Sequence, residues 1–307
     1  MSATALIAVD WGTSNRRAWR LNRAGEVLDA RHDGAGLLAV KDGRFAQSLQ
    51  DLIGDWLTQA PGVPILMAGM VGSKRGWVEA PYLHAPLDLA TLSQRLHPVA
   101  ELAGCPVRVV PGVCVASDDR APDVMRGEET QIYGALVLTG RNSAVLLLPG
   151  THAKWASVDT GVLRGFRTYM TGELFNLLRT HSILGQLMQG DVPVEETFLQ
   201  GVQVSRQAAA GGLLHDLFSV RTLGLSGRLP PSAGASYLSG LLIGAEIADA
   251  CRHFRPAPGE SILAVGSSEL SALYRTAAAE FGLTLNVLDN ATLFPAAMHR
   301  IATAISL

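Results

Sequence analysis

The chain has 307 residues, of which 48% are hydrophobic and 17% are charged, and its formal net charge is −2 at pH 7. This balance excludes a mostly disordered chain, and the length is sufficient for two domains that each bury a core. The near-neutral charge gives no electrostatic reason to expect nucleic acid or a membrane surface as the partner, so we expect a small molecule. Neither a signal-like start nor an apolar run as long as a membrane span is visible, which favours a cytoplasmic protein.

The N-terminal third is expected to form a sheet covered by one helix. Alternating apolar residues predict strands over residues 4–10, 16–22 and 26–32, joined by short polar turns as an antiparallel meander. Apolar residues at helical spacing predict a helix over residues 45–57, and a short apolar run predicts a buried strand over residues 64–68. This β-β-β-α-β order is like one half of a ribonuclease H-like domain.

The turn after the first strand is a candidate anion site. Asp10 ends the apolar run, and Gly12, Thr13 and Ser14 follow it. Such a turn can direct backbone N–H groups and hydroxyls at a phosphate, and a carboxylate beside it can hold a divalent cation. A capping or turn role for Asp10 is the simpler alternative.

A loop without clear periodicity follows the strand at residues 64–68 and is a candidate for substrate binding. It contains the cations Lys74 and Arg75 and the aromatic residues Trp77 and Tyr82. Ligands of open α/β sheets usually bind at loops of this kind, at the carboxyl end of a strand. The order Gly-Ser-Lys differs from the Gly-Lys-Ser/Thr of a P-loop, which excludes that motif. A solvated surface loop and aromatic core packing are the alternatives.

A domain boundary is expected in the middle of the chain. The stretch at residues 116–122 is typical of a linker, so we expect domains over residues 1–122 and 123–307. A helix is predicted from Glu128 onward, at the start of the second domain.

The second domain is expected to repeat the order strand, hairpin, strand. An apolar run leads into Gly150 and Thr151, a second candidate phosphate turn, and Lys154 lies on the strand that leaves it. A strand over residues 162–169 and a helix that begins at Thr171 follow. This repetition supports two related halves.

The last part of the chain is expected to alternate helices and strands. Helices are predicted near residues 194–209, 234–253, 269–281 and 291–305, and strands over residues 261–265 and 284–288. The turn formed by Gly266, Ser267 and Ser268 connects a strand to a helix.

The motif order resembles a known superfamily. The Asp-x-Gly-Thr-Ser turn, the Gly-Thr hairpin and the Gly-Ser-Ser turn resemble the ATPases that include sugar kinases, hexokinase, actin and Hsp70. A closer resemblance covers nearly the whole chain. Met-Arg-Gly-Glu-Glu-Thr-Gln at residues 125–131, Leu-Pro-Gly-Thr-His-Ala-Lys-Trp at 148–155 and Thr-Tyr-Met-Thr-Gly-Glu-Leu-Phe at 168–175 look like the 2-dehydro-3-deoxygalactonokinase family.

The resemblance implies a fold and an activity. The fold would be α/β, with two ribonuclease H-like domains of the actin-like ATPase (sugar kinase) type and an interdomain cleft for ATP and Mg²⁺. The activity would be that of a phosphotransferase, which phosphorylates the 6-hydroxyl of 2-dehydro-3-deoxy-D-galactonate in galactonate catabolism.

The resemblance also implies roles at the nucleotide. Asp10 would hold Mg²⁺ through water, because Mg²⁺ gives up its hydration shell reluctantly. Arg17 falls at the arginine of a glycerol-kinase-like turn and would bridge to phosphate, and Lys154 would either neutralise the transferring charge or face solvent. The phosphate-facing residues would be Gly12, Thr13, Ser14, Gly150 and Thr151, and the adenosine motif would be Gly266, Ser267 and Ser268.

Sugar kinases of this superfamily place an acid at the start of the helix before the second hairpin, where it accepts the proton of the attacking hydroxyl. Here Glu128 is the first candidate, Glu129 the second and Asp123 an outside candidate. Alternatively, both glutamates only stabilise the helix N-terminus through its dipole.

An acid sugar carries a carboxylate, for which a planar, forked cation is the favoured partner. We therefore expect Arg75 to bind the carboxylate with Lys74 beside it, and Lys154 or Arg167 as the next candidates. The remaining substrate-binding candidates are Trp77, Tyr82 and Thr171.

Two other functions stay open at this point. A kinase of another small sugar or sugar acid would carry the same ATP motifs, because a fold does not fix the substrate. A non-catalytic sugar-sensing module is less favoured, because both phosphate turns are intact. A homo-oligomer is compatible with the sequence.

Overall fold

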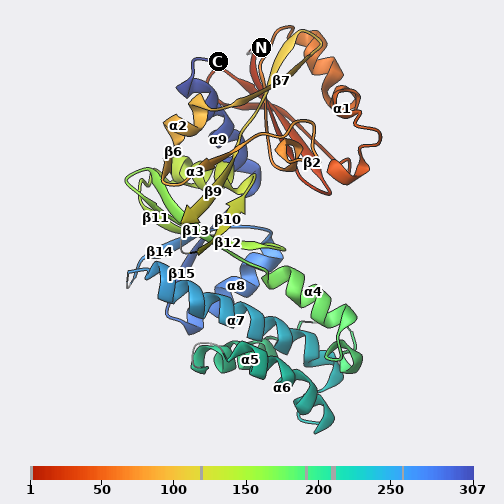
Figure 1. The fold of residues 1–307 in the computed structure, drawn as a ribbon, viewed down its shortest axis with the longest axis vertical. Coiled ribbons are helices and arrows are strands. Elements are labelled where there is room, and N and C mark those ends of the chain that lie inside the picture. Colours follow the sequence, from red (N-terminus) through yellow and green to blue (C-terminus); the bar gives the residue numbers. More distant parts are fainter. Residues whose placement is uncertain (1–2, 118–119, 191–192, 209–211, 258) are drawn as a thin grey trace. The chain divides into compact units, whose positions relative to one another are not determined.

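The computed structural model describes residues 3–117, 120–190, 193–208, 212–257 and 259–307 and shows a mixed α/β protein (Figure 1). Contacts divide the chain into two compact units. Unit 1 comprises Met1–Ala144, Val158–Phe166 and Asp289–Leu307, and unit 2 comprises Val145–Ser157 and Arg167–Leu288. None of the described helices is both long and apolar enough to cross a membrane.

A six-stranded sheet forms the centre of unit 1, in the order β3-β2-β1-β4-β8-β7. Its strands are β1 Thr4–Trp11, β2 Arg16–Asn22, β3 Val27–Asp33, β4 Ile65–Ala68, β7 His97–Leu102 and β8 Cys105–Val109. The antiparallel pairs β1–β2 and β2–β3 confirm the predicted meander. Strands β1, β4 and β8 run parallel, so their carboxyl ends lie at the same edge.

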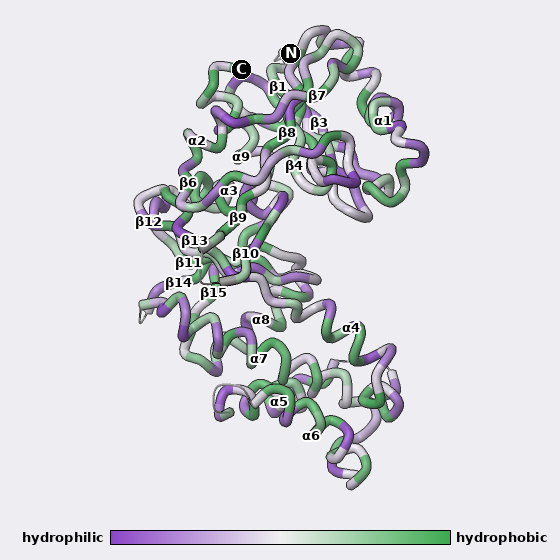
Figure 2. Tube along the Cα trace, viewed as in Figure 1, coloured by the Kyte–Doolittle hydropathy of each residue, from purple (hydrophilic) through white to green (hydrophobic). Residues whose placement is uncertain are grey.

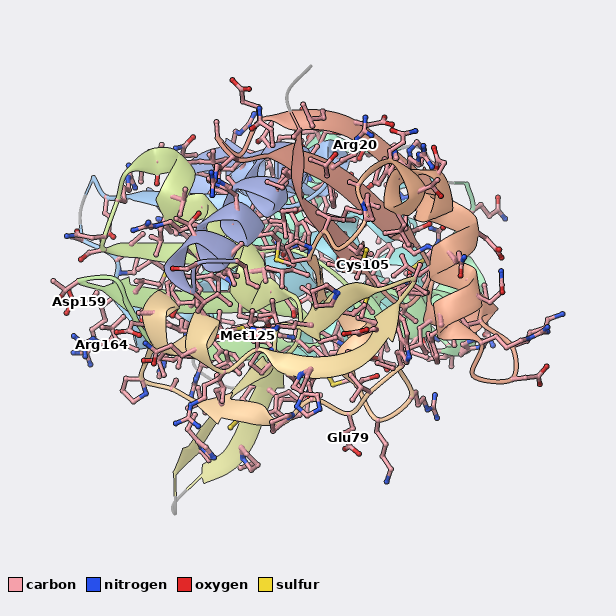
Figure 3. All side chains as sticks on the ribbon, turned by 90° about the horizontal axis from the view of Figure 1, so that it is seen from above. Arg20, Glu79, Cys105, Met125, Asp159 and Arg164 are labelled. Carbon is pink, nitrogen blue, oxygen red and sulfur yellow. The ribbon has the colours of Figure 1, made fainter. Side chains whose placement is uncertain are left out.

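Helix α1, Phe45–Gln59, packs its apolar side chains into the core of unit 1. Leu49 and Ile53 are fully buried beside Trp56, as their helical spacing predicted. Truncating a side chain such as Leu49 to alanine would cost about 2–5 kcal/mol, the usual range for a cavity in a packed core. Cys105 is buried in the same core, whereas Glu79 extends away from the ribbon (Figure 3).

The C-terminal helix α9, Asn290–Ala304, also belongs to unit 1 and packs against α3, Glu128–Thr139. A Cβ atom at Gly134 would lie only 2.4 Å from the carbonyl oxygen of Leu293, so a glycine permits this close approach. Unit 1 therefore does not end at residue 122. The expected domains, over residues 1–122 and 123–307, differ from these two compact units. The expected domains stay a prediction.

The expected linker over residues 116–122 contains strand residues instead. Residues 116 and 117 lie in β9, Gly112–Ser117, and residues 120–122 lie in β10, Arg120–Met125, whereas residues 118 and 119 lie outside the described residues. Strand β9 pairs with β10 on one side and with β5, Tyr82–His84, on the other, in a small sheet. The polar composition was misleading, because strands are joined through their backbones, as between Met125 and Val113. Such pairing does not require an apolar side chain at every position.

A further sheet has the order β15-β14-β11-β12-β13-β6, and the division between the units passes through β12 and β13. Its strands are β6 Leu87–Asp88, β11 Ala144–Leu148, β12 Ala153–Asp159, β13 Val162–Tyr169, β14 Ser261–Val265 and β15 Thr284–Leu288. Strands β11, β14 and β15 are parallel. Their positions agree closely with the predicted strands.

Most of unit 2 is helical. Its longer helices are α4 Thr171–His181, α5 Glu195–Gln207, α6 Leu213–Leu225, α7 Gly234–Phe254 and α8 Ser268–Glu280. Helices α5 and α7 approach very closely, since a Cβ at Gly240 would lie 2.0 Å from the carbonyl oxygen of Phe198. Figure 2 shows hydrophobic and hydrophilic segments in alternation along α5, whose buried residues include Phe198 and Val202. The sequence did not predict α6, where Leu214 and Phe218 are exposed and blur the apolar face.

Candidate active site

Asp10 lies at the carboxyl end of β1, where its backbone is paired with Arg17 of β2 and Ala68 of β4. Burial raises the pKa of Asp10 to about 6, while the positive charge of Arg17 lowers it and the negative charge of Glu128 raises it. The charge of Glu128 therefore acts on Asp10, and both residues belong to unit 1. A cation beside Asp10 would relieve both the burial and the repulsion.

Two glycines allow the elements that carry Asp10 and Glu128 to meet, and the sequence interpretation missed both. A Cβ atom at Gly69, directly after β4, would lie 2.9 Å from the carbonyl oxygen of Trp11 and 3.5 Å from Oδ1 of Asp10. A Cβ at Gly127, directly before α3, would lie 3.2 Å from the Cα of Gly69. Both residues have positive φ, of 94° and 106°. Only glycine takes these angles without strain, so the ends of β1, β4 and the start of α3 can meet.

The two glutamates at the start of α3 have different environments. Glu129 is fully buried, and both its carboxylate oxygens accept hydrogen bonds from the backbone N–H of Gly127, at 2.9 and 2.7 Å. Burial, with the nearby charge of Glu128, raises the pKa of Glu129 to about 8. Glu128 is partly exposed, and its Oε2 accepts from the backbone N–H of Arg126 at 3.0 Å. Of the pair, only Glu128 has solvent-exposed surface.

Asp123, the outside candidate, lies on β10 and precedes the α3 start. Its Oδ1 accepts from the backbone N–H of Val124 at 2.8 Å. The negative charge that raises the pKa of Asp10 is that of Glu128.

The first phosphate turn has a defined backbone structure. The N–H of Gly12 donates to the carbonyl of Asn15 at 3.0 Å, so this amide closes the turn. The carbonyl of Thr13 accepts from Leu38 at 3.2 Å, and the side chains of Thr13, Ser14 and Arg17 are exposed. The turn therefore offers hydroxyls and one guanidinium to an anion, while Gly12 shapes it.

The loop between β4 and β5 keeps its two cations exposed, at Lys74 and Arg75. Trp77 is partly buried, packs against the core of unit 1 and donates its backbone N–H to Val71 at 2.8 Å. Tyr82 begins β5, and its ring lies 4.4 Å from the guanidinium carbon of Arg126. Packing of these two aromatic residues thus holds the later half of the loop.

In unit 2 the second phosphate turn is fixed to the start of α4. A Cβ at Gly172 would lie 2.6 Å from the carbonyl oxygen of Gly150, and the N–H of Glu173 donates to Thr151 at 3.0 Å. The imidazole Nε2 of His152 pairs with the carboxylate of Glu173. This histidine therefore has a structural partner in the turn.

The two further cations considered for the substrate are engaged within unit 2. The side chain of Lys154 is only 4% exposed, and its Nζ donates to the carbonyl of His152 at 3.3 Å. The guanidinium of Arg167 forms an ion pair with Asp249 at 2.8 Å. Strand alternation left open that Lys154 faces solvent, and the structure shows that it does not.

A cavity of about 520 Å³ opens beside the second phosphate turn. Its lining includes Gly150, Thr151, Thr171, Asn176, Ser267 and Tyr274. Oγ of Ser267 accepts from the N–H of Leu270 at 3.3 Å and so caps α8, whereas Ser268 is the exposed first residue of that helix. The predicted Gly150–Thr151 turn and Gly266–Ser268 turn thus meet at one cavity of unit 2, although Gly266 and Ser268 do not line it.

A buried carboxylate supports this cavity and was not found from the sequence. Glu246 of α7 accepts hydrogen bonds from Nε1 of Trp155 at 2.8 Å, the hydroxyl of Tyr274 at 2.6 Å and the hydroxyl of Thr171. Burial raises the pKa of Glu246 to about 7, and the three hydrogen bonds lower it. A charged residue inside the apolar run of α7 was the available signal.

Comparison with known proteins shows the family of this chain. The sequence profile of the 2-keto-3-deoxy-galactonokinase family matches residues 10–301. The chain belongs to this family. It is 36% identical over 300 residues to the 2-dehydro-3-deoxygalactonokinase of Escherichia coli strain K12, which covers 98% of each chain. The family resemblance drawn from the three motifs is confirmed, and with it an enzyme of the kinase class, a phosphotransferase with an alcohol group as acceptor.

Solved structures show the same relationship. A crystal structure from Sinorhizobium meliloti, to which 2-dehydro-3-deoxygalactonokinase activity is ascribed, superposes with a TM-score of 0.89 at 35% identity and covers 98% of this chain and 99% of the other. The ADPNP-bound activator of 2-hydroxyisocaproyl-CoA dehydratase from Clostridium difficile has a TM-score of 0.50 at 11% identity, over 98% and 94% of the chains. The second likeness concerns the fold alone.

Proposed function

We propose that this chain uses ATP to phosphorylate the 6-hydroxyl of 2-dehydro-3-deoxy-D-galactonate, a step in the breakdown of galactonate. Membership of the family and the name of the Escherichia coli relative support this substrate. The observation that carries the proposal is the close approach of Gly69 both to Oδ1 of Asp10 and to Gly127, which brings the start of α3 with Glu128 toward the end of β1.

Glu128 is the proposed general base. This residue is partly exposed at the start of α3, whereas Glu129 is fully buried against Gly127. A base must reach the proton of the attacking hydroxyl, so exposure favours Glu128. In this mechanism Glu128 accepts that proton as the hydroxyl oxygen bonds to the γ-phosphorus and the bond to the leaving ADP oxygen breaks.

Asp10 is the proposed residue for Mg²⁺. The residues fit such an ion, because the buried carboxylate of Asp10 carries a raised pKa and Glu128 adds a second negative charge nearby. Mg²⁺ is commonly held by one or two carboxylates together with water and substrate phosphate oxygens. When bound, the ion would neutralise charge on the phosphates. The carboxylate of Asp10 would hold the ion at the end of β1.

The cavity in unit 2 is the proposed nucleotide site. Gly150 and Thr151 would bind phosphate oxygens, and the capped N-terminus of α8 at Ser267 would lie near the adenosine. Lys154 lies buried on the strand that leaves the same turn and would add positive charge. The other proposed nucleotide contacts are Gly12, Thr13, Ser14, Arg17, Gly266 and Ser268.

The finer description of the fold is also a proposal. The β-β-β-α-β order of unit 1 and the likeness to the dehydratase activator support two ribonuclease H-like domains of the actin-like ATPase type. Lys74, Arg75, Trp77, Tyr82 and Thr171 stay the substrate-binding candidates under this reading.

The experiment that tests the proposed function is a coupled ADP-release assay with a panel of sugar acids and neutral sugars. We expect the 2-dehydro-3-deoxy-D-galactonate to give the highest kcat/KM, and phosphorus NMR of the product to show the phosphate ester on the C6 methylene. A neutral hexose with a higher kcat/KM would favour another sugar kinase activity. Binding without any ADP release would favour a sugar-sensing module.

A further inference from the structure

Arg126 carries a guanidinium that is buried beneath the loop between β4 and β5. Arg126 is only 9% exposed, and its Nη2 donates to the carbonyl of Ala80 at 2.7 Å. The guanidinium carbon lies 4.4 Å from the ring of Tyr82. Its Nε and Nη1 are buried and have no hydrogen-bond partner among the described residues.

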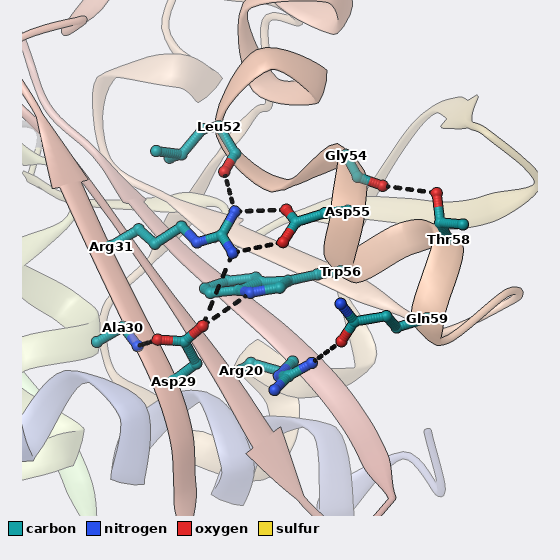
Figure 4. A network of polar contacts seen from close by, with 10 residues as sticks. All are labelled: Arg20, Asp29, Ala30, Arg31, Leu52, Gly54, Asp55, Trp56, Thr58 and Gln59. Atoms are coloured by element: carbon teal, nitrogen blue, oxygen red, sulfur yellow. Dashed lines mark hydrogen bonds and ion pairs between the residues drawn. The ribbon is translucent and has the colours of Figure 1, made fainter.

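Three other arginines of unit 1 lie over aromatic rings. Arg20 is the most distant, at 5.7 Å from the ring of Trp56, and donates to Oε1 of Gln59 at 2.7 Å, whereas the other two have a carboxylate partner. Arg31 lies 4.4 Å from the ring of Trp56 and binds both oxygens of Asp55, at 2.5 and 2.7 Å (Figure 4). Arg16 lies 4.6 Å from Trp11 and binds both oxygens of Asp33. Arg126 has the same aromatic contact without the anion, within the described part of the chain.

The acid that interacts electrostatically with Arg126 is Glu129, but burial raises the pKa of Glu129 to about 8, which weakens it as a counter-charge. No ion pair joins Arg126 to an acidic group within 4.0 Å among the residues that the structure describes. The carboxylate of the neighbouring Glu129 is bound to Gly127, and Glu79 extends away from the ribbon (Figure 3). A buried cation without a bound anion is unfavourable. This site is therefore suited to an anionic group that a ligand brings.

The position of Arg126 connects the proposed base to the substrate loop. Its backbone N–H donates to the carboxylate of Glu128 at 3.0 Å, two residues away. Its side chain lies against the loop, where a Cβ at Gly72 would come within 3.0 Å of Nη1. One residue thus touches both the group that would activate the hydroxyl and the loop that follows β4.

We propose that Arg126 binds the carboxylate of the sugar acid and so selects acids over neutral sugars. The inference rests on the proposed function and assigns this role to a buried cation in place of the exposed Arg75. Tyr82 is 40% exposed and covers the guanidinium, so the carboxylate reaches Nη1 and Nη2 when that ring rotates away. The planar guanidinium can then donate two parallel hydrogen bonds, which a lysine cannot.

The test compares Arg126→Met and Arg126→Lys with wild type, using the sugar acid and its C1 amide. Methionine keeps an unbranched stem and removes the charge. We expect KM for the acid to rise about 10- to 100-fold in both variants, the range for lost charged hydrogen bonds, with kcat little changed. KM for the amide should change less than threefold. An unchanged KM for the acid, or equal losses for acid and amide, would overturn the proposal.

A second measurement separates binding from a purely structural role. In Arg126→Met the ligand-free protein should keep or raise its melting temperature, because an unpaired buried charge has been removed, but the acid should no longer raise it further. Arg31→Met is the matched control, since it should lower the melting temperature and leave KM for the acid unchanged. A lowered melting temperature in Arg126→Met with a retained shift by the acid would assign Arg126 a structural role.

The proposed function and this inference fail in different ways. If the wild type phosphorylates no sugar acid, the proposed function is refuted, and calorimetric titration of the acid into wild type and Arg126→Met still tests carboxylate binding. If the wild type is active and Arg126→Met has normal KM for the acid, only the inference is refuted. Arg75→Ala measured beside them decides between the two arginines, because the larger loss of acid selectivity identifies the carboxylate partner.

Discussion

The backbone N–H of Gly127 donates to both carboxylate oxygens of Glu129, which is fully buried behind the start of α3. Burial raises the pKa of Glu129 from 4.5 to about 8, which favours the protonated form of this carboxyl in the folded protein. A protonated carboxyl cannot accept the proton of an attacking hydroxyl. Glu129 is therefore suited to a structural role and leaves the basic role to Glu128.

The stability of the protein should reflect this shift. Between pH 4.5 and about 8 the unfolded chain has lost the proton of Glu129 while the folded protein keeps it, so the free energy of unfolding falls as pH rises through this window. Glu129→Gln removes the titration. We expect the free energy of unfolding of the variant, relative to that of wild type, to be higher at pH 8 than at pH 5. The difference should be on the order of a few kcal/mol, since each unit of pKa corresponds to about 1.4 kcal/mol. Urea unfolding at both pH values measures this, and a difference that does not change with pH would contradict it.

Asp10→Asn should keep the fold and lower kcat by about a hundredfold or more, the scale of losing a preorganised electrostatic partner. The amide is similar in shape but cannot balance a divalent cation. The measurement is kcat as a function of Mg²⁺ concentration, with circular dichroism as the control for folding. Turnover close to wild type in a folded Asp10→Asn protein would rule out the metal assignment.

Gly69→Ala tests the close approach of β4 to Asp10. The new Cβ would lie 2.9 Å from the carbonyl of Trp11 at a φ of 94°, so it must displace backbone. We expect a loss of about 1–3 kcal/mol in stability, the usual cost of a strained backbone position, and a lower kcat. Gly62→Ala is the matched control, because its φ is 78° but nothing lies within 4 Å of its Cβ. Equal effects of the two variants would mean that positive φ alone matters.

Glu246→Gln tests the support of the cavity in unit 2. Glutamine keeps one acceptor oxygen, but its NH₂ group faces donors, so at least one of Trp155, Thr171 and Tyr274 loses its partner. An unsatisfied buried donor costs about 1–3 kcal/mol. We expect a lower melting temperature and a KM for ATP that rises more than KM for the sugar acid. A change in melting temperature with KM for ATP untouched would limit Glu246 to the core.

Much of the fold could be predicted because its signals are local. The β1–β3 meander and α1 follow from alternating or helically spaced apolar residues, and these predictions are confirmed. The strands at residues 116–122 and the helix α6 were missed, because pairing across strands and exposed apolar residues such as Leu214 give no clear local pattern. Long-range packing decides such elements.

The site shows the same limit. Asp10 and Glu128 are visible in sequence as acids at the ends of predicted elements, but their proximity depends on Gly69 and Gly127, which are far apart in the chain. The burial of Glu129, one residue from Glu128, cannot be read from a motif in which both glutamates favour a helix start. Likewise, Arg75 and Arg126 differ in burial and not in chemistry.

The central claim is that Glu128, and not Glu129, is the general base. It is tested most directly by measuring ADP release in the presence of the sugar acid for wild type, Glu128→Gln and Glu129→Gln. We expect wild type to release ADP with 2-dehydro-3-deoxy-D-galactonate and Glu128→Gln to lose about 10²–10⁴ in kcat with little change in KM, because only the proton acceptor is removed. Glu129→Gln should keep kcat within about tenfold of wild type, since Glu129 touches no substrate in this account. A large loss in Glu129→Gln beside normal turnover in Glu128→Gln would contradict it.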